Sequence, residues 1–256
     1  MSSSAPKLLD LTFDGPVAFL RLDDGRGNAL SGAMLQAIEK ALKDAEEARV
    51  VVLSGREKIF GGGLDLPGLL SGDRAAIRDF VGLFNRVHLQ LLSYPRPLIT
   101  VARGSAVAGG AILLCAGDER LVAPNGAIGI PEVALGLPFP IAALELVRVA
   151  LGERGVAEAA LTGRMYEGEE RKRVGFATEV LAPEALEPRA RELAAERAKL
   201  DPVAVARVRM QLRRAGLERV KANVDADTEA FLDCWFSPRA QEELKAAVER
   251  LKAPRK

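Results

Sequence analysis

Two glycine-rich segments in the first half of the chain are the features best suited to chemistry on a developing negative charge. The first, Phe60–Leu66, contains three consecutive glycines, and the second, Arg103–Gly110, leads into a long apolar stretch. Glycine lets the backbone approach a ligand closely and expose its N–H groups. At a helix start these groups lack intrahelical partners, and the helix dipole favours an anion there. Two such groups aimed at one point would form an oxyanion hole, although each segment taken alone is more typical of a tight turn.

Other common catalytic and phosphate-binding motifs do not fit the sequence. Gly104–Gly109 has the glycine spacing of a phosphate-binding loop, but Gly110 and Ala111 stand where lysine and serine or threonine are required. No nucleophile elbow surrounds Ser105, and the single histidine, His88, lies in the middle of an expected helix, where a structural role is favoured. One histidine and two cysteines are too few for a zinc site, so we expect no metal centre.

The charge balance argues against nucleic-acid and membrane partners. The chain has 36 basic and 35 acidic residues, a formal net charge of +1, and no long block of one sign. Its longest apolar run, Ala106–Gly117, is shorter than the roughly 18 residues that span a bilayer. The first residues do not resemble a secretory signal. We therefore expect a cytoplasmic protein in which Cys115 and Cys234 are free, buried thiols.

These chemical segments must be positioned by a mixed core of strands and helices. Apolar runs predict strands over residues 8–12, 17–22, 50–53 and 98–101, and helical spacing predicts helices over residues 34–45, 73–93 and 107–116. Asp, Gly and Pro in residues 13–16 suit a tight turn, so the first two strands should form a hairpin. Strand alternating with helix indicates an α/β fold.

The second half of the chain is predominantly helical. Alanine-rich amphipathic patterns predict helices over residues 141–151, 155–162, 185–200, 203–214, 224–236 and 238–251. We place a boundary at Asp201-Pro202, which separates a core of residues 1–200 from a C-terminal helical region of residues 201–256 with an oligomerisation or lid role. Phe231, Trp235 and Phe236 form an apolar patch, and we interpret it as packing against the core or a sister subunit rather than as ligand contact.

Three segments in register give the sequence a family resemblance. With Phe60–Leu66, Arg103–Asp118 and Gly129–Gly136 in the family's order and spacing, the chain resembles the enoyl-CoA hydratase/isomerase family, or crotonase superfamily, over essentially its whole length. The resemblance implies an α/β fold, a crotonase-like spiral of ββα units with a C-terminal helical region. It implies a homotrimer or a dimer of trimers. It also implies an acyl-CoA substrate, with coenzyme A as part of the thioester and no tightly bound cofactor.

The resemblance further implies roles for individual residues. The backbone N–H groups of Leu64 and Gly109 match the pair that holds the thioester oxygen of an enolate, and Glu132 matches a catalytic glutamate. Arg26 is matched as a contact to a CoA phosphate, and Leu64–Pro67 as the path of the CoA. The substrate-binding residues implied in this way are Arg26, Gly63, Leu64, Asp65, Leu66, Pro67, Gly109, Gly110 and Ile112.

The sequence departs from the hydratases of this family at one acid. Hydratases carry two glutamates; the second matches Glu132, but Ile112 occupies the position of the first. Hydration needs one group to activate water and another to protonate carbon, and loss of one such group typically costs about 10²–10⁴ in rate. Isomerisation of a 3-enoyl-CoA to a trans-2-enoyl-CoA needs a single base, so we expect that reaction, in fatty-acid β-oxidation. The apolar residues expected to surround Glu132 and raise its pKa are Ile112, Ile130, Leu135 and Leu137.

Alternative functions remain open. One is a 2-enoyl-CoA hydratase in which another acid, or water held by Glu132 alone, replaces the missing glutamate. Another is a non-catalytic member that binds acyl-CoA, a protein or RNA, although the retained Glu132 and the mixed charges of residues 39–47 argue against it. A 3-hydroxyacyl-CoA hydrolase ranks third, because Pro140 stands where its acid is expected. The isomerase is favoured because Gly63–Leu66 and residues 231–251 are similar to mitochondrial-type 3,2-enoyl-CoA isomerases.

Overall fold

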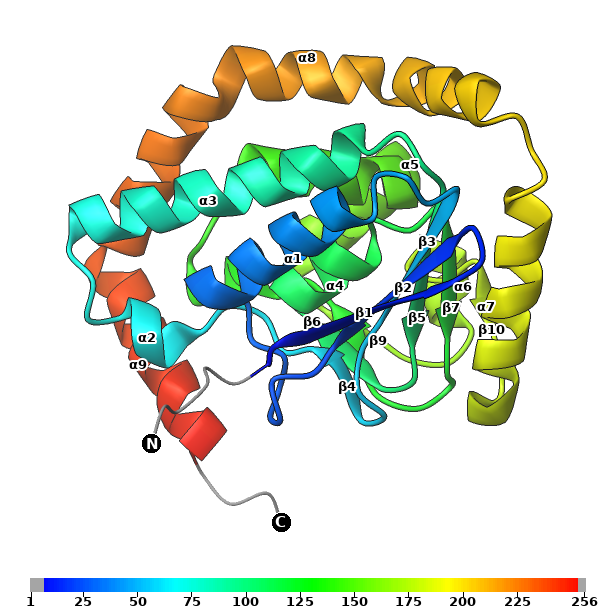
Figure 1. The fold of residues 1–256 in the computed structure, drawn as a ribbon. Helices are drawn as coiled ribbons and strands as arrows, with labels where there is room; N and C mark the ends of the chain where they lie inside the picture. The colour runs from blue at the N-terminus through cyan, green and yellow to red at the C-terminus, as the bar shows by residue number, and fades with distance from the viewer. Residues whose placement is uncertain (1–6, 253–256) are drawn as a thin grey trace, which may run out of the picture.

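The computed structural model describes residues 7–252, and a six-stranded sheet lies at the centre of the fold (Figure 1). Its strands, in spatial order, are β1 (Leu9–Asp14), β2 (Val17–Leu22), β3 (Val50–Ser54), β5 (Leu98–Ala102), β7 (Glu119–Val122) and β10 (Glu179–Val180). β1 and β2 pair antiparallel, and every other neighbouring pair is parallel. The expected hairpin and the strands expected at residues 50–53 and 98–101 are confirmed.

Helices cover both faces of this sheet. In chain order they are α1 (Gly32–Asp44), α2 (Leu66–Leu69), α3 (Arg74–Ser93), α4 (Gly109–Leu114), the 3-10 helix η1 (Glu132–Leu135), α5 (Ile141–Thr162), α6 (Glu170–Val174), α7 (Pro183–Arg197), α8 (Pro202–Trp235) and α9 (Pro238–Lys252). The Ser31 side chain accepts a hydrogen bond from the Met34 N–H, and Asp73 accepts one from Ala76. These caps satisfy free N–H groups and fix where α1 and α3 begin.

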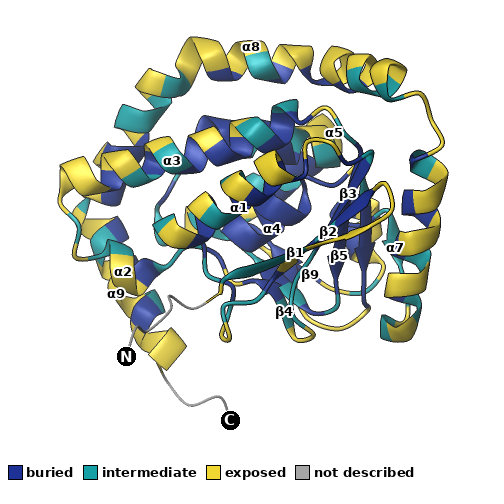
Figure 2. Ribbon diagram, viewed as in Figure 1, coloured by how far each residue is buried: buried dark blue, intermediate teal, exposed yellow. Residues whose placement is uncertain are grey.

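Alternation along the strands divides the sheet into two buried faces. On β3, Val50 and Val52 pack with α7, whereas Val51 and Leu53 point into the main core with α1, α3 and α4. Because β3 is buried on both sides, its sequence is apolar at four consecutive positions. Figure 2 shows the resulting buried strands inside a shell of helices whose outer surfaces are exposed.

A second sheet of very short strands carries the glycine-rich segments. Its strands, in spatial order, are β4 (Ile59–Gly61), β6 (Ser105–Val107), β8 (Ile128–Gly129) and β9 (Met165–Tyr166). β4 and β6 pair in parallel, with Gly61 opposite Ala106. Strands of two or three residues are too short for an alternating pattern, and the sequence therefore did not predict this sheet. It brings the two glycine-rich segments side by side.

The structure corrects several expected helix boundaries. Residues 107–116 do not form one helix, because Val107 ends β6 and α4 covers only six residues. The helices expected at residues 203–214 and 224–236 are parts of the single 34-residue helix α8. The two helices expected within residues 141–162 are joined in α5, but Gly152 has non-helical angles, so a break at that point is present as a kink.

The first half of α8 docks on the core through buried arginines. Arg209 and Arg213 both pair with Asp118, which directly precedes β7, and their side chains are almost completely buried. Arg209 also donates to the Tyr94 carbonyl oxygen, at 3.1 Å. Asp118 itself is exposed, so water partly screens these two ion pairs. Asp201 caps the start of α8, at the boundary expected from the sequence, but the division into residues 1–200 and 201–256 stays an interpretation.

Both cysteines are free thiols, as expected, and their burial differs. Cys115 is buried, as expected, whereas Cys234 is only half-buried, so its expected burial is wrong. Burial raises the pKa of the Cys115 thiol to about 12, so this residue stays protonated and unreactive at neutral pH. Within residues 7–252, we find no helix with the length and apolar character needed to cross a membrane. The cytoplasmic location stays a prediction.

Candidate active site

The two glycine-rich segments meet backbone to backbone. A Cβ atom on Gly110 would lie 2.1 Å from the Gly61 carbonyl oxygen, and one on Gly61 would lie 2.9 Å from the Gly110 Cα. Gly63 has a φ of +91°, and a Cβ atom there would lie 2.9 Å from the Ala108 Cβ. No side chain fits at these positions without moving the backbone. The glycines are therefore required for the contact between the segments.

This contact places two unpaired backbone N–H groups next to each other. Leu64 bridges Leu30 through bonds from Leu30 N to Gly63 O and from Asp65 N to Leu30 O, which leaves the Leu64 N–H on the opposite side of the strand. Gly109 is the first residue of α4, so its N–H has no intrahelical acceptor. Within the described residues neither group donates a hydrogen bond to the backbone. A Cβ atom on Gly63 would lie only 3.7 Å from the Gly109 nitrogen.

Ala108 makes the sharp turn that aims Gly109. Its φ of 52° and ψ of −127° are unusual for a residue with a side chain, and such angles cost about 1–3 kcal/mol. The turn is held by bonds from Ala108 N to Gly129 O and from Ile112 N to Ala108 O. The chain thus passes from β6 into α4 through Ala108 alone, and strain is stored beside the unpaired Gly109 amide.

Glu132 begins η1 and has an unpaired, buried carboxylate oxygen. Part of the residue is accessible, but its Oε2 atom is buried and has no hydrogen-bond partner. Burial raises the pKa of Glu132 to about 8, against a smaller opposing effect of its own backbone N–H. The expected rise in the pKa is therefore found. η1 is held at its end by Gly136, whose position allows close packing on Ala240 of α9.

Glu132 shares a small cavity with Leu64 and Gly109. The cavity holds about 20 Å³, roughly the space of one water molecule. The rest of its wall is apolar and consists of Phe80, Val81, Phe84, Ile112, Leu137, Pro138, Pro140 and Phe231. Among these lining residues, Glu132 alone has a titratable side chain. Of its expected apolar neighbours, Ile112 and Leu137 line the cavity, whereas Ile130 and Leu135 do not.

The other residues expected to bind substrate differ in their structural roles and in their burial. The Asp65 side chain accepts a hydrogen bond from the Gly68 N–H and caps α2, and Pro67 is exposed in the first turn. Leu66 is buried in an apolar cluster with the C-terminal helices. In the second segment, Gly110 and Ile112 are buried in α4. Helix α2 begins at Leu66, two residues after Leu64, and the Asp65 cap fixes its first turn.

Arg26 lies apart from the cavity, on an exposed loop. The loop is tied to the first glycine-rich segment by a bond from Gly62 N to Gly27 O, at 2.9 Å. Asn28 anchors its end, because its buried side-chain amide donates to the carbonyl oxygens of Leu22 and Phe60. Arg26 is therefore next to the segment that carries Leu64 but does not contact Glu132.

Comparison with known proteins identifies the family. The family model described as enoyl-CoA hydratase/isomerase matches residues 12–256. The chain belongs to the enoyl-CoA hydratase/isomerase family.

Relatives within the family carry different activity names. A putative enoyl-CoA hydratase of Thermus thermophilus is 35% identical over 199 residues, which cover 75% of this chain and 78% of the relative. A crystal structure of an enoyl-CoA hydratase from Mycobacterium ulcerans has a TM-score of 0.82 at 33% identity, over 88% of this chain and 99% of that one. The human mitochondrial delta3-delta2-enoyl-CoA isomerase has a TM-score of 0.91 over 96% and 98% of the two chains, but at 24% identity it shows the fold alone.

Sequence reasoning missed the aromatic residues that line the cavity. Phe80 and Phe84 lie one turn apart on α3, and Phe231 comes from α8, far away in sequence. Phe80 and Phe84 fit the apolar spacing of α3, and this spacing does not distinguish a residue that lines a cavity from one that only packs in the core. Of the expected apolar patch, Phe231 and Trp235 are buried, so the prediction of core packing is confirmed for these two. Phe231 also lines the cavity.

The other unusual titratable residue, His88, has the structural role that the sequence favoured. Its Nδ1 atom lies 2.8 Å from the Phe84 carbonyl oxygen, and its ring stacks on Phe84. Complete burial lowers its pKa to about 4, so the imidazole is neutral at physiological pH. In residues 7–252, no group of three or more histidine, cysteine or acidic side chains is arranged to hold a metal ion.

Proposed function

We propose that this protein isomerises 3-enoyl-CoA thioesters to trans-2-enoyl-CoA, with Glu132 as the single acid and base. The observation that carries the proposal is the cavity itself, in which one unpaired carboxylate lies with the backbone amides of Leu64 and Gly109. A second group able to move a proton is missing from the lining residues, since Ile112 occupies the corresponding side. One base meets the needs of a proton shift between carbons.

In the proposed reaction, the Glu132 carboxylate removes a proton from C2 of the substrate. The electrons of the C–H bond form a dienolate, and its oxygen accepts hydrogen bonds from Leu64 and Gly109. Each such donor typically contributes about 2.7–4 kcal/mol to the transition state. Glu132 then returns the proton to C4, which leaves the double bond between C2 and C3. No water is consumed, and no proton is gained or lost overall.

Coenzyme A would enter as part of the substrate, with no tightly bound cofactor. Leu64–Pro67 offer a fixed backbone beside the thioester, and Arg26 carries an exposed positive charge on the adjoining loop. We assign Arg26 to a CoA phosphate and Gly63, Asp65, Leu66, Pro67 and Gly110 to the walls of the path. This assignment is supported because these residues lie beside the Leu64 and Gly109 amides, where the two glycine-rich segments are in contact.

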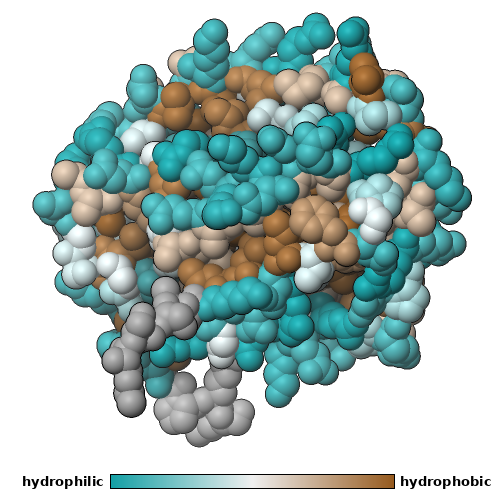
Figure 3. Space-filling model, viewed as in Figure 1, coloured by the Kyte–Doolittle hydropathy of each residue, from teal (hydrophilic) through white to brown (hydrophobic). Residues whose placement is uncertain are grey.

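A homotrimer or a dimer of trimers is proposed as the assembly. Helix α8 exposes several apolar side chains, among them Val203, Val208 and Leu212, the last of which is 76% exposed. Figure 3 shows further apolar surface in the band between α8 and α3. Apolar surface of this kind is typical of association sites.

A substrate comparison tests the reaction directly. Purified protein is offered a 3-enoyl-CoA and, separately, a 2-enoyl-CoA; conjugation of the double bond and addition of water are followed independently. We expect isomerisation to dominate, and Glu132→Gln to lower it by about 10²–10⁴ and to abolish exchange of the C2 proton with deuterated solvent. Dominant water addition would instead support the hydratase, which the name of the Thermus thermophilus relative favours. Binding of acyl-CoA without either reaction would support a non-catalytic protein.

A further inference from the structure

The cavity at Glu132 is too small for the acyl group that the proposed reaction requires. Its volume of about 20 Å³ corresponds to roughly one water molecule, whereas an enoyl group has several carbon atoms. Part of the wall must therefore move when substrate binds. Which part moves depends on how firmly each wall residue is held.

Two wall residues, Ile112 on α4 and Phe84 on α3, are firmly held. Ile112 and Phe84 are both buried in the main hydrophobic core, with side chains that are almost inaccessible. The Phe84 ring also stacks on the buried His88 ring, with centroids 4.0 Å apart. Moving either side chain would open a hole in close-packed core, which is costly.

Phe231 belongs to a separate, smaller cluster. This cluster joins the end of α8 and α9 to α2 and to the start of α3, and it is distinct from the main core. Within it, the Phe231 ring lies against Trp235, with centroids 5.9 Å apart. Phe231 is thus supported by other C-terminal residues rather than by the centre of the protein.

Exposed ion pairs hold the helix on both sides of Phe231. Arg74 on α3 pairs with Glu229 and Asp233, the latter at 2.7 Å, and Arg78 pairs with Glu229. The side chains involved are between 44% and 72% exposed. Exposed pairs are screened by water and salt and resist motion only weakly. Phe231 is therefore held less firmly than Ile112 and Phe84, which belong to the main core.

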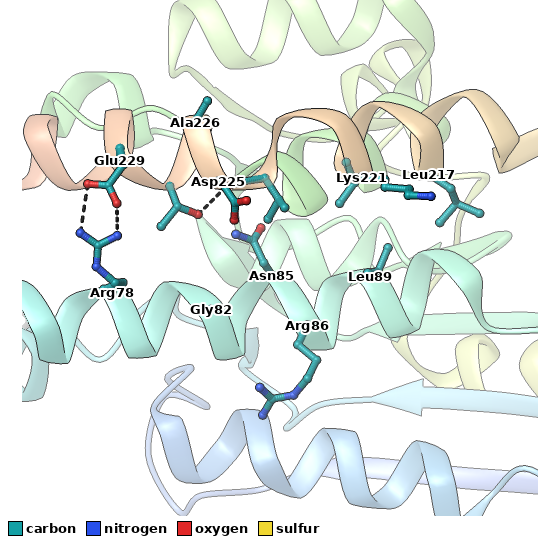
Figure 4. A pocket seen from close by; sticks show the side chains of 13 residues that line it. Arg78, Gly82, Asn85, Arg86, Leu89, Leu217, Lys221, Asp225, Ala226 and Glu229 are labelled. Atoms are coloured by element: carbon teal, nitrogen blue, oxygen red, sulfur yellow. Dashed lines mark hydrogen bonds and ion pairs between the residues drawn. The ribbon is translucent and has the colours of Figure 1, made fainter.

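A large groove lies between α3 and α8, next to the helix segments that carry Phe84 and Phe231 (Figure 4). Asn85 lines the groove, while the preceding residue, Phe84, lines the cavity; Thr228 lines the groove one turn before Phe231. Figure 4 shows Arg86 pointing toward α1, and the Asn85 Oδ1 atom accepts a hydrogen bond from the Ala142 N–H of α5. The groove has a volume of about 1000 Å³. Its larger apolar lining residues are Leu89, Leu217, Val220 and Val224.

We propose that Phe231 limits the length of the acyl chain by closing the passage from the Glu132 cavity into this groove. The inference rests on the proposed function and names its substrate class, short-chain enoyl-CoA thioesters. A short acyl group needs only a small displacement of the Phe231 ring. A longer chain extends into the groove and needs the ring to leave its place beside Trp235.

A chain-length series in Phe231 variants tests this inference. We compare kcat/KM for six-carbon and twelve-carbon enoyl-CoA in the wild type, Phe231→Ala, the milder Phe231→Leu, and the control Phe236→Ala, whose side chain is at the surface and does not line the cavity. We expect Phe231→Ala to raise the twelve-to-six-carbon ratio by about tenfold or more and Phe231→Leu to raise it less. The ratio is used because partial unfolding lowers both rates equally.

Outcomes of the series separate this inference from the proposed function. An unchanged ratio in both Phe231 variants, with an active wild type, would overturn the role of Phe231 and leave the isomerase proposal standing. If the wild type turns over neither substrate, the proposed function fails. Calorimetric binding of saturated acyl-CoA of the same lengths then still tests Phe231, because the expected shift in preference concerns binding of the chain. Equal effects of Phe236→Ala and Phe231→Ala would also contradict the role.

Discussion

At the scale of the residue, Glu132 can act as a base only when it is deprotonated, and burial disfavours its charged form. Burial raises its pKa to about 8, so the folded protein holds this side chain mostly protonated at neutral pH. We therefore expect kcat/KM for isomerisation to rise about tenfold per pH unit below pH 8 and to level off above it. The pH profile of kcat/KM from pH 6 to 9.5 measures this. A flat profile would exclude Glu132 as the titrating base of the free enzyme.

The stability of Glu132→Gln provides a control for that profile. A carboxyl group whose pKa is raised by folding contributes stability below its unfolded pKa of about 4.3, and this contribution is lost as the pH rises through about 8. Glutamine does not ionise. The Tm of Glu132→Gln relative to the wild type should therefore increase between pH 5 and 9, and a constant difference would show that the folded pKa is not raised.

At the scale of elements, contact between β4 and the start of α4 decides the position of both amides. Gly110→Ala would put a Cβ atom 2.1 Å from the Gly61 carbonyl oxygen, so the two segments must separate. We expect a loss of about 1–3 kcal/mol or more in the free energy of unfolding, measured with urea, and a fall in kcat/KM. Gly82→Ala is the matched control, because a Cβ atom there meets nothing within 4 Å and alanine favours the interior of α3. Equal stability of the two variants would contradict the close contact.

At the scale of the whole molecule, the apolar side chains along α8 call for a partner surface. If the protein is a trimer, Leu212→Asp should reduce the sedimenting mass toward that of the monomer, because a charge would be buried in the interface. Phe13→Asp serves as a control on the β1–β2 hairpin, outside α8, where Phe13 is 56% exposed. A wild-type protein that sediments as a monomer at micromolar concentration would contradict the assembly.

The sequence determined the elements whose signals are local. The periodicity of α1 and α3 and the apolar run of β3 predicted these elements, because such signals arise from neighbouring residues of one segment. The spacing of the motifs likewise predicted the family, and the resemblance implied that Leu64, Gly109 and Glu132 belong to one site.

Tertiary structure alone decided how that site is closed. Phe231 reaches the cavity from a helix almost one hundred residues beyond Glu132, and no local pattern relates the two. The second sheet is also invisible locally, since strands of two or three residues are stabilised by their partners rather than by their own sequence. Cavity size, the burial of Oε2 and the groove between α3 and α8 all depend on packing between distant segments, which pattern and composition do not encode.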